Sequence, residues 1–228
     1  MKVYGKNVAL EVLKEDNLVE KVYLAKYFSD KRIISMIENL NLRPIILDKN
    51  DLMKFDKYNH QGIILDIKDF IYCDPNCLLK YDKLLILDHI EDQHNLGAII
   101  RTAEAAGLKG IVIPKDRAAE VTDTTIKTSA GTVFKMDIAR VTNIARFIDD
   151  IKKEGFWITG TSLNAETDFK DVDYSGKMAI VIGNEGKGMS PLVESKCDYL
   201  VKIPMRGTTN SLNASVAAGI MIYEMIRE

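Results

Sequence analysis

The 228-residue sequence is poor in cysteine, lacks a long apolar run and carries almost no net charge. Its three cysteines (Cys73, Cys77 and Cys197) are an odd number without CxxC spacing, which argues against a disulfide framework and against a cysteine-based zinc site. We therefore expect reduced thiols without a functional role. No segment reaches the roughly 18 uninterrupted apolar residues of a membrane span, and no apolar signal core follows Met1 to Lys6. These absences predict a cytoplasmic protein that does not bind a membrane.

The balance of charge and composition is that of an ordinary globular chain. The 31 basic and 33 acidic residues leave a net charge of −2, so bulk charge gives no sign of polyanion binding, although it does not exclude local basic patches. With 46% apolar and 28% charged residues, no disordered or repetitive tract dominates the sequence. The length allows one large domain or two small ones.

Residues 1–70 alternate helix-like and strand-like segments. Helices are expected at 7–14, 30–40 and 51–55, and strands at 21–25, 44–47 and 62–67. This alternation is typical of a small α/β domain. Residues 71–82, with turn residues around a proline, are the expected linker.

Residues 83–228 have the clearer rhythm of a parallel α/β sheet. The apolar run 84–87, a helix at 95–106 and a second run at 110–114 form a βαβ unit. Continuous apolar runs of this kind are typical of strands buried on both faces. Further strands are expected at 134–138, 156–161, 178–182 and 199–203, and further helices at 143–153 and 191–197.

The expected last helix, residues 212–226, carries two apolar stripes. One contains Leu212, Val216, Ile220 and Tyr223, and the other contains Ala217, Met221 and Met225. Because an isolated domain rarely buries two sides of a terminal helix, the stripes indicate a dimer interface.

The glycine cluster 183–190 follows an apolar strand. It lacks the lysine position of a P-loop, and its G-x-x-G-x-G spacing differs from a dinucleotide fingerprint. Two interpretations stay open: a loop that lets a ligand approach the backbone at the carboxyl end of a strand, or a turn that only caps the next helix.

Two further polar segments also follow strands. In the first, Asn95 is expected to cap a helix, and Arg101 is expected to project from the second turn of that helix. A helix start and an arginine together are suited to binding a phosphate group. His89 and His94 are spaced without convincing further ligands, so we assign no metal site. In the second, residues 203–215, Ser211 is either a site residue or only a helix cap.

Together and in order, the three segments resemble the signature motifs of the SpoU, or TrmH-like, family of RNA ribose 2′-O-methyltransferases. Residues 95–107 (NLGAIIRTAEAAG) resemble the first motif, 182–188 (IGNEGKG) the second and 203–213 (IPMRGTTNSLN) the third. His60-Gln61-Gly62 resembles the substrate-binding domain of the RlmB-type branch, which methylates a guanosine of large-subunit ribosomal RNA.

The resemblance implies a fold, a cofactor and an assembly. The fold is a small N-terminal α/β domain similar to ribosomal protein L30e (residues 1–70), followed by a SPOUT parallel-sheet domain (83–228) with a C-terminal trefoil knot, an exception to unknotted topology. The cofactor is S-adenosyl-L-methionine, and the assembly is a homodimer that acts on 23S-type ribosomal RNA. Positions matching cofactor-binding residues are Thr161, Gly183, Ile203 and Leu212, and those matching catalytic residues are Asn95, Arg101, Glu185, Ser211 and Asn213.

The implied reaction is an in-line displacement, which requires the hydroxyl to be aligned and its deprotonation to be eased, and which needs no metal. The family assigns hydroxyl activation to the arginine at the position of Arg101, but a guanidinium is effectively never deprotonated. We interpret Arg101 as a clamp on the adjacent phosphate that stabilises the developing alkoxide, with base action only in strongly perturbing surroundings.

Three rival interpretations of the sequence are a transfer RNA methyltransferase, a non-catalytic RNA-binding assembly factor and a nucleotide-dependent oxidoreductase. Retention of all five catalytic positions disfavours the second, and the missing fingerprint disfavours the third. Five basic residues of the N-terminal domain are candidates for RNA contact, although such charges also occur on ordinary solvated faces: Lys2, Lys6, Lys26, Lys31 and Arg32.

Overall fold

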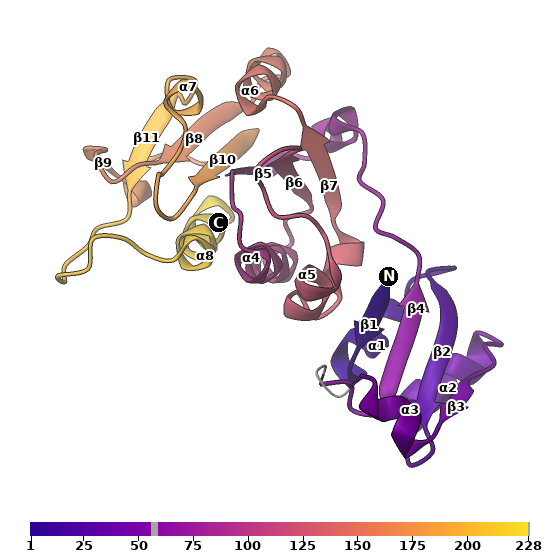
Figure 1. Cartoon of the computed structure of the whole chain (residues 1–228). Helices are drawn as coiled ribbons and strands as arrows, with labels where there is room; N and C mark the ends of the chain where they lie inside the picture. The colour runs from indigo at the N-terminus through magenta and orange to yellow at the C-terminus, as the bar shows by residue number, and fades with distance from the viewer. Residues whose placement is uncertain (56–58, 228) are drawn as a thin grey trace. The chain divides into compact units, whose positions relative to one another are not determined.

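The computed structural model describes residues 1–55 and 59–227, which form two compact units (Figure 1). Unit 1 comprises Met1–Ile71 and Val121–Phe134, and unit 2 comprises Tyr72–Glu120 and Lys135–Glu228. Both are α/β, so the predicted class, a small N-terminal α/β domain followed by a parallel-sheet domain, is confirmed. No helix within the described residues is long and apolar enough to cross a membrane.

Unit 1 is built on a four-stranded sheet with the order β1-β4-β2-β3. Strand β2 pairs antiparallel with β4 and parallel with β3, so the ends of β2 and β3 and the start of β4 meet at one edge. The elements of this unit are β1 (Lys2–Tyr4), α1 (Lys6–Val12), β2 (Val19–Ala25), α2 (Lys31–Asn39), β3 (Ile45–Leu47), α3 (Lys49–Met53), β4 (Ile63–Ile67) and α5 (Asp123–Thr128).

The insertion of residues 121–134 into unit 1 is a feature that the sequence pattern did not predict. Helix α5 packs against β1, and a Cβ placed on Gly131 would lie 2.9 Å from the Cβ of Glu11. The rings of Phe70 and Phe134 are 6.1 Å apart. A truncation that removes the first 71 residues would therefore expose the surface of 121–134 that packs on them.

Unit 2 contains a seven-stranded sheet with the order β7-β6-β5-β10-β8-β11-β9, in which every pair of neighbours is parallel. Figure 1 shows α4 and α8 on one side of this sheet and α6 and α7 on the other. The elements are η1 (Pro75–Lys80), β5 (Lys83–Asp88), α4 (Gln93–Ala105), β6 (Gly110–Pro114), β7 (Asp137–Val141), α6 (Ile144–Lys153), β8 (Trp157–Thr161), β9 (Thr167–Asp168), η3 (Phe169–Asp171), β10 (Met178–Gly183), α7 (Pro191–Glu194), β11 (Tyr199–Lys202) and α8 (Ala214–Met225). The 3-10 turn η2 (Thr132–Lys135) belongs to unit 1 up to Phe134.

The central strands owe their position to their apolar runs. Leu84 to Leu87 in β5 are fully buried, because neighbouring residues point to opposite faces and helices cover both. Leu84 and Ile86 pack in one cluster with Ile148 of α6. Burying a side chain of this size contributes about 1.5–3 kcal/mol, so these runs fix the middle of the sheet.

Several of the expected boundaries were wrong: helix 191–197 ends at Glu194, helix 51–55 begins at Lys49, and two other differences have a clear local cause. The strand predicted at 134–138 is β7, Asp137–Val141, because residues 132–135 form a 3-10 turn and β7 pairs in register with all of β6. The helix predicted from Asn95 begins at Gln93, where Asp92 supplies the cap through a 2.8 Å hydrogen bond from the Asn95 N–H. Arg101 consequently lies in the third turn of α4 and not in the second.

Of the residues expected as a linker, 71–82, all but Ile71 are part of unit 2. Leu78 of η1 is fully buried, and the Cys73 N–H donates to the Ile138 carbonyl over 2.9 Å. The expectation of three reduced thiols was wrong, because Cys73 and Cys77 form a disulfide. The 3-10 turn that begins at Pro75 brings their Cα atoms to 6.5 Å, which four-residue spacing alone did not indicate.

Cys197 is the free thiol, and we expect it to resist alkylation. Burial raises the pKa of Cys197 to about 12, so its thiolate at pH 8 is about a thousandfold scarcer than that of an ordinary cysteine. After mild reduction of the native protein, iodoacetamide should therefore label Cys73 and Cys77 and leave Cys197 unlabelled, as counted by mass spectrometry. Urea-unfolded protein, the control, should take three labels, and equal labelling of all three in the native state would contradict this burial.

Candidate active site

A pocket of about 270 Å³ lies where three parallel strands of unit 2 end. Its walls come from the residues after β8, the end of β10 with its glycine loop, the end of β11 and the start of α8. Open parallel sheets bind ligands at this carboxyl edge. The pocket contains six of the nine predicted site residues: Thr161, Gly183, Glu185, Ile203, Ser211 and Leu212.

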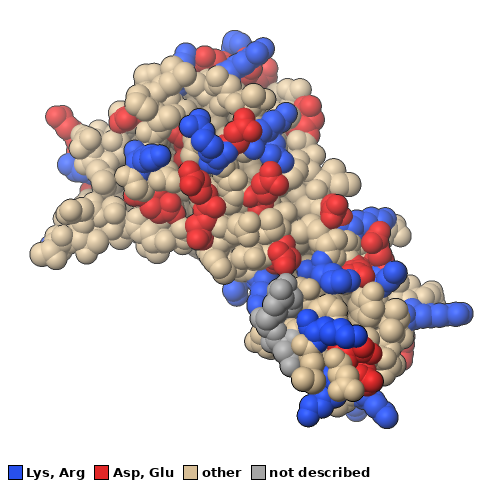
Figure 2. All heavy atoms as spheres, viewed as in Figure 1, with Lys and Arg blue, Asp and Glu red and all other residues tan. Residues whose placement is uncertain are grey.

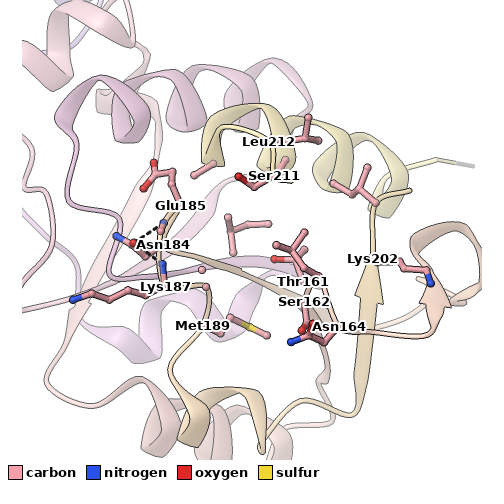
Figure 3. A pocket seen from close by; sticks show the side chains of 18 of the residues that line it. Thr161, Ser162, Asn164, Asn184, Glu185, Lys187, Met189, Lys202, Ser211 and Leu212 are labelled. Atoms are coloured by element: carbon pink, nitrogen blue, oxygen red, sulfur yellow. Dashed lines mark hydrogen bonds between the residues drawn. The ribbon is translucent and has the colours of Figure 1, made fainter. Parts of the chain in front are cut away.

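The loop that follows β10 is a tight turn organised by Asn184. Its Oδ1 accepts hydrogen bonds from the N–H groups of Gly186 and Lys187 at 3.0 and 3.2 Å (Figure 3), and its Nδ2 donates to the His89 carbonyl at 3.0 Å. The backbones of Asn184 and Gly188 also pair with each other. The glycine cluster is therefore a structured wall of the pocket and not only a helix-capping turn.

Gly183 is required by close approach of this loop to the strand. A Cβ at this position would lie 2.3 Å from the Met189 nitrogen and 2.4 Å from the Gly188 carbonyl carbon. Any side chain would therefore push the loop away from β10 and change the shape of the pocket.

A buried carboxylate fixes the far end of the same loop. Asp88, the last residue of β5, is 1% exposed, and its Oδ2 accepts the Ser190 N–H at 2.7 Å. His89 Nδ1 donates to Asp88 Oδ1 at 2.6 Å. The sequence analysis did not single out Asp88, although a polar residue at the end of a fully apolar strand is a signal that could have identified it.

Three predicted catalytic residues from three distant segments meet at the rim of the pocket. Asn95 on α4 donates from Nδ2 to Glu185 Oε1, and Asn213 donates from Nδ2 to Asn95 Oδ1 at 3.0 Å. Asn95 thus uses its amide as donor and acceptor at once, which fixes its orientation. This network joins the three sequence motifs.

Asn213, and not Ser211, caps helix α8. Its Oδ1 accepts the Ser215 N–H at 2.9 Å and the Ser215 hydroxyl at 2.6 Å, while Ser211 lies in the pocket wall. The question left open for Ser211 is therefore answered by geometry: it is not the cap, and it lines the cavity.

Removing the Asn213 side chain should cost measurable stability. Asn213→Ala loses the cap of α8, and we expect the free energy of unfolding to fall by about 1 kcal/mol. Asn213→Asp is the matched control, because it keeps the capping oxygen and loses only the amide donor to Asn95; it should cost less. Urea unfolding of both variants tests this, and equal destabilisation by the two would argue against the capping role.

Arg101 is a predicted catalytic residue that lies outside both the pocket lining and the Asn95–Glu185–Asn213 network. Its side chain is exposed on α4, and it forms no hydrogen bond or ion pair with any residue that the structure describes. It does not line the pocket. The guanidinium is therefore available to a ligand from outside the chain.

Several residues that line the pocket were not predicted from the sequence. Some are polar and lie after β8 or in β11, and one is an apolar residue of the glycine loop: Ser162, Asn164, Lys202 and Met189 (Figure 3). Apolar side chains of β10, β11 and α8 complete the lining, among them Ile182, Val201 and Ala217. The pocket thus combines an apolar surface with polar groups, as sites for small organic cofactors do.

Two family models match nearly the whole chain. Residues 82–223 match the SpoU rRNA Methylase family, and residues 2–73 match a family described as RNA 2′-O ribose methyltransferase substrate binding. The first match covers most of unit 2 together with the inserted residues 121–134 of unit 1, and the second covers the N-terminal part of unit 1.

Related sequences point the same way. A Bacillus subtilis (strain 168) protein, YacO, whose name assigns it to the TrmH family of tRNA/rRNA methyltransferases, is 41% identical over 99% of this chain and 95% of its own length. A Staphylococcus aureus (strain COL) protein with the same assignment is 48% identical over 71% of this chain and 68% of its own length.

Solved structures share the fold. The SpoU methyltransferase AviRb from Streptomyces viridochromogenes, in complex with the cofactor AdoMet, superposes with a TM-score of 0.86 at 24% identity, covering 100% of this chain and 89% of AviRb. The TrmH/SpoU tRNA modifying enzyme of A. aeolicus is 31% identical, with a TM-score of 0.59 and coverage of 67% of this chain and 83% of its own.

Proposed function

Since this chain belongs to the SpoU rRNA methylase family, whose members are S-adenosylmethionine-dependent RNA methyltransferases, we propose that it methylates a ribose 2′-hydroxyl of RNA. The target that we propose is a guanosine of large-subunit ribosomal RNA. The observation that carries the proposal is the meeting of three sequence motifs at one pocket, with Asn95, Glu185 and Asn213 hydrogen-bonded at its rim.

The residues of the pocket fit S-adenosylmethionine, which supplies a methyl group on a positively charged sulfur. Ile182, Ile203 and Leu212 offer an apolar surface to an adenine ring, and Thr161 and Asn164 offer hydrogen-bonding groups to the polar parts of the cofactor. Glu185 is both a member of the hydrogen-bonded network and a carboxylate of the pocket lining, and a negative charge there favours a sulfonium.

The chain's own residues would then align the acceptor. The amide of Asn95, itself oriented by Asn213, holds Glu185 in one orientation at the rim, where a ribose can approach. Arg101 supplies a planar cation for the phosphate next to that ribose and for charge developing on the attacking oxygen. Alignment of this kind supplies much of the rate of a bimolecular displacement.

Exposed apolar residues on α8 support a homodimer. Met221 and Met225 of one predicted stripe are buried and its Ala217 is half-buried, whereas Val216 and Tyr223 of the other stripe are 50% and 54% exposed. The first stripe is thus mostly covered within the chain, and the second leaves these two apolar side chains uncovered. A second copy of the chain is the partner that we propose for the uncovered stripe, and a trefoil knot at the pocket, as in the family, belongs to the same proposal.

A transfer RNA target is the second candidate, and the likeness of 67% of this chain to a tRNA modifying enzyme favours it. Full-length protein, labelled S-adenosylmethionine and transcripts of large-subunit ribosomal RNA or transfer RNA separate the two. We expect label in ribosomal RNA, recovered as 2′-O-methylguanosine after digestion. Label confined to transfer RNA would favour the second candidate, and no label in either, despite cofactor binding, would point to a precursor particle or a binding function.

A further inference from the structure

Unit 1 has a pocket of its own, about 480 Å³ in volume, at the edge where β2 and β3 end and β4 begins. This volume falls within the roughly 300–1,000 Å³ of small-ligand sites. Six of its residues carry the argument that follows: Lys26, Tyr27, Lys49, Leu52, Met53 and His60.

Tyr27 presents an aromatic ring at this pocket. A Cβ placed on Gly62, whose φ is +81°, would lie 3.4 Å from Tyr27 Cε2, so the ring rests beside the glycine backbone. Tyr27 is nevertheless 69% exposed, and neighbouring Met53 is 59% exposed. A supported ring with an open surface is what unpaired nucleic acid bases stack on.

The basic side chains of unit 1 differ in whether a carboxylate of the chain lies beside them. Lys2 is paired with Asp66, whose pKa is lowered by the lysine and Tyr23 although burial opposes the shift. Asp30 lies 3.9 Å from Lys6 and 3.6 Å from Arg32. Three of the five basic residues expected to contact RNA are therefore at least partly neutralised.

Lys26 and Lys49 differ from these three. Both are exposed, and neither forms an ion pair with any residue among 1–55 and 59–227. Figure 2 shows basic side chains projecting from the end of unit 1 at which Figure 1 places α3. The pocket lining thus offers two lysine ammonium groups that can bind a phosphate. Asp48 is the acidic residue in the same lining.

His60 is held in place at this pocket by the backbone. Its Nδ1 accepts the Gly62 N–H at 2.9 Å, which fixes the orientation of the ring. Gln61 holds the same turn in place, because its Oε1 accepts the Lys6 N–H at 2.8 Å. The His60-Gln61-Gly62 segment therefore shapes this pocket through its backbone and side chains.

We propose that this pocket holds one unpaired nucleotide of the RNA substrate, with its base stacked on Tyr27 and a phosphate bound by Lys26 and Lys49. The proposal rests on the proposed function for the identity of the polymer as RNA. The apolar floor formed by Leu52 and Met53 suits a base, and the two free lysines suit the backbone. The match of residues 2–73 to a substrate-binding family is consistent with an RNA ligand here.

The test is fluorescence anisotropy with the full-length protein and a fluorescein-labelled single-stranded RNA of ten nucleotides, alone or annealed to its complement. Tyr27→Ala should weaken single-strand binding about 10- to 100-fold, while Tyr27→Phe, which keeps the ring, should bind within about twofold of the parent. The double variant Lys26→Gln/Lys49→Gln should reduce the slope of log affinity against log salt by about 1.4. Lys21→Gln/Lys68→Gln, exposed lysines outside the pocket, is the matched charge control.

The outcomes are decisive without any methyl transfer, so they stay informative if the proposed activity fails. Binding by Tyr27→Ala at the parent's affinity, equal weakening of single-strand and duplex binding, or no binding of the single strand by the parent protein would each overturn the proposal. An equal loss of salt dependence in the control lysine variant would show a diffuse basic face instead of a nucleotide pocket.

Discussion

Arg101→Ala is expected to lower the rate of methyl transfer by about 100- to 1,000-fold while leaving the affinity for S-adenosylmethionine unchanged. The loss is that of one charge-stabilising group at the reacting oxygen. The affinity should persist because Arg101 is exposed on α4 and does not line the cofactor pocket. Single-turnover transfer and isothermal calorimetry with the cofactor measure the two quantities separately.

Controls make the Arg101 result specific. Arg146→Ala removes an exposed arginine from α6 and should leave both quantities unchanged. Because Arg101 is a surface residue without partners in the described chain, its loss should change the free energy of unfolding by less than about 0.5 kcal/mol. A parallel loss of cofactor affinity would instead assign Arg101 a structural role.

Gly183→Ala is expected to weaken binding of S-adenosylmethionine by about 10- to 100-fold. The added Cβ would collide with the backbone of Gly188 and Met189 at 2.3 to 2.4 Å, and the glycine loop must move to relieve it. Overpacking of this kind costs about 1–3 kcal/mol, and each 1.4 kcal/mol is tenfold in affinity. Calorimetric titration of the variant with the cofactor gives the change directly.

Gly207→Ala is the matched control for this substitution. A Cβ at position 207 would meet nothing within 4 Å, and the residue does not line the pocket. Its cofactor affinity should equal that of the parent protein. Unchanged affinity in Gly183→Ala would mean that the loop does not shape the cofactor site.

The central strands were predictable because their signal is local. Leu84 to Leu87 form an apolar run that only a doubly buried strand accommodates, and the structure places it in the middle of the sheet. The caps were less predictable, since Asp92 and Asn95, or Ser211 and Asn213, are equally good capping residues a few positions apart. Only the backbone geometry of each turn selects between them.

Contacts between residues far apart in the sequence could not be predicted from the sequence pattern. Nothing local to residues 121–134 indicates that they pack on the first unit, and the hydrogen bonds of Asn95 with Glu185 and Asn213 join residues 90 and 118 positions apart. The family resemblance grouped these side chains as one site, but their pairing is visible only in three dimensions. The isolation of Arg101 is likewise a structural observation, and the cytoplasmic location stays a prediction.

The most direct test of the central claim is methyl transfer from labelled S-adenosylmethionine to a large-subunit ribosomal RNA fragment and to the same fragment with 2′-deoxyguanosine at the nucleotide that becomes labelled. Ribose methylation predicts that incorporation disappears with this substitution, because the attacking oxygen has been removed. Undiminished incorporation into the deoxy fragment would contradict the account, since the methyl group would then be carried by the base.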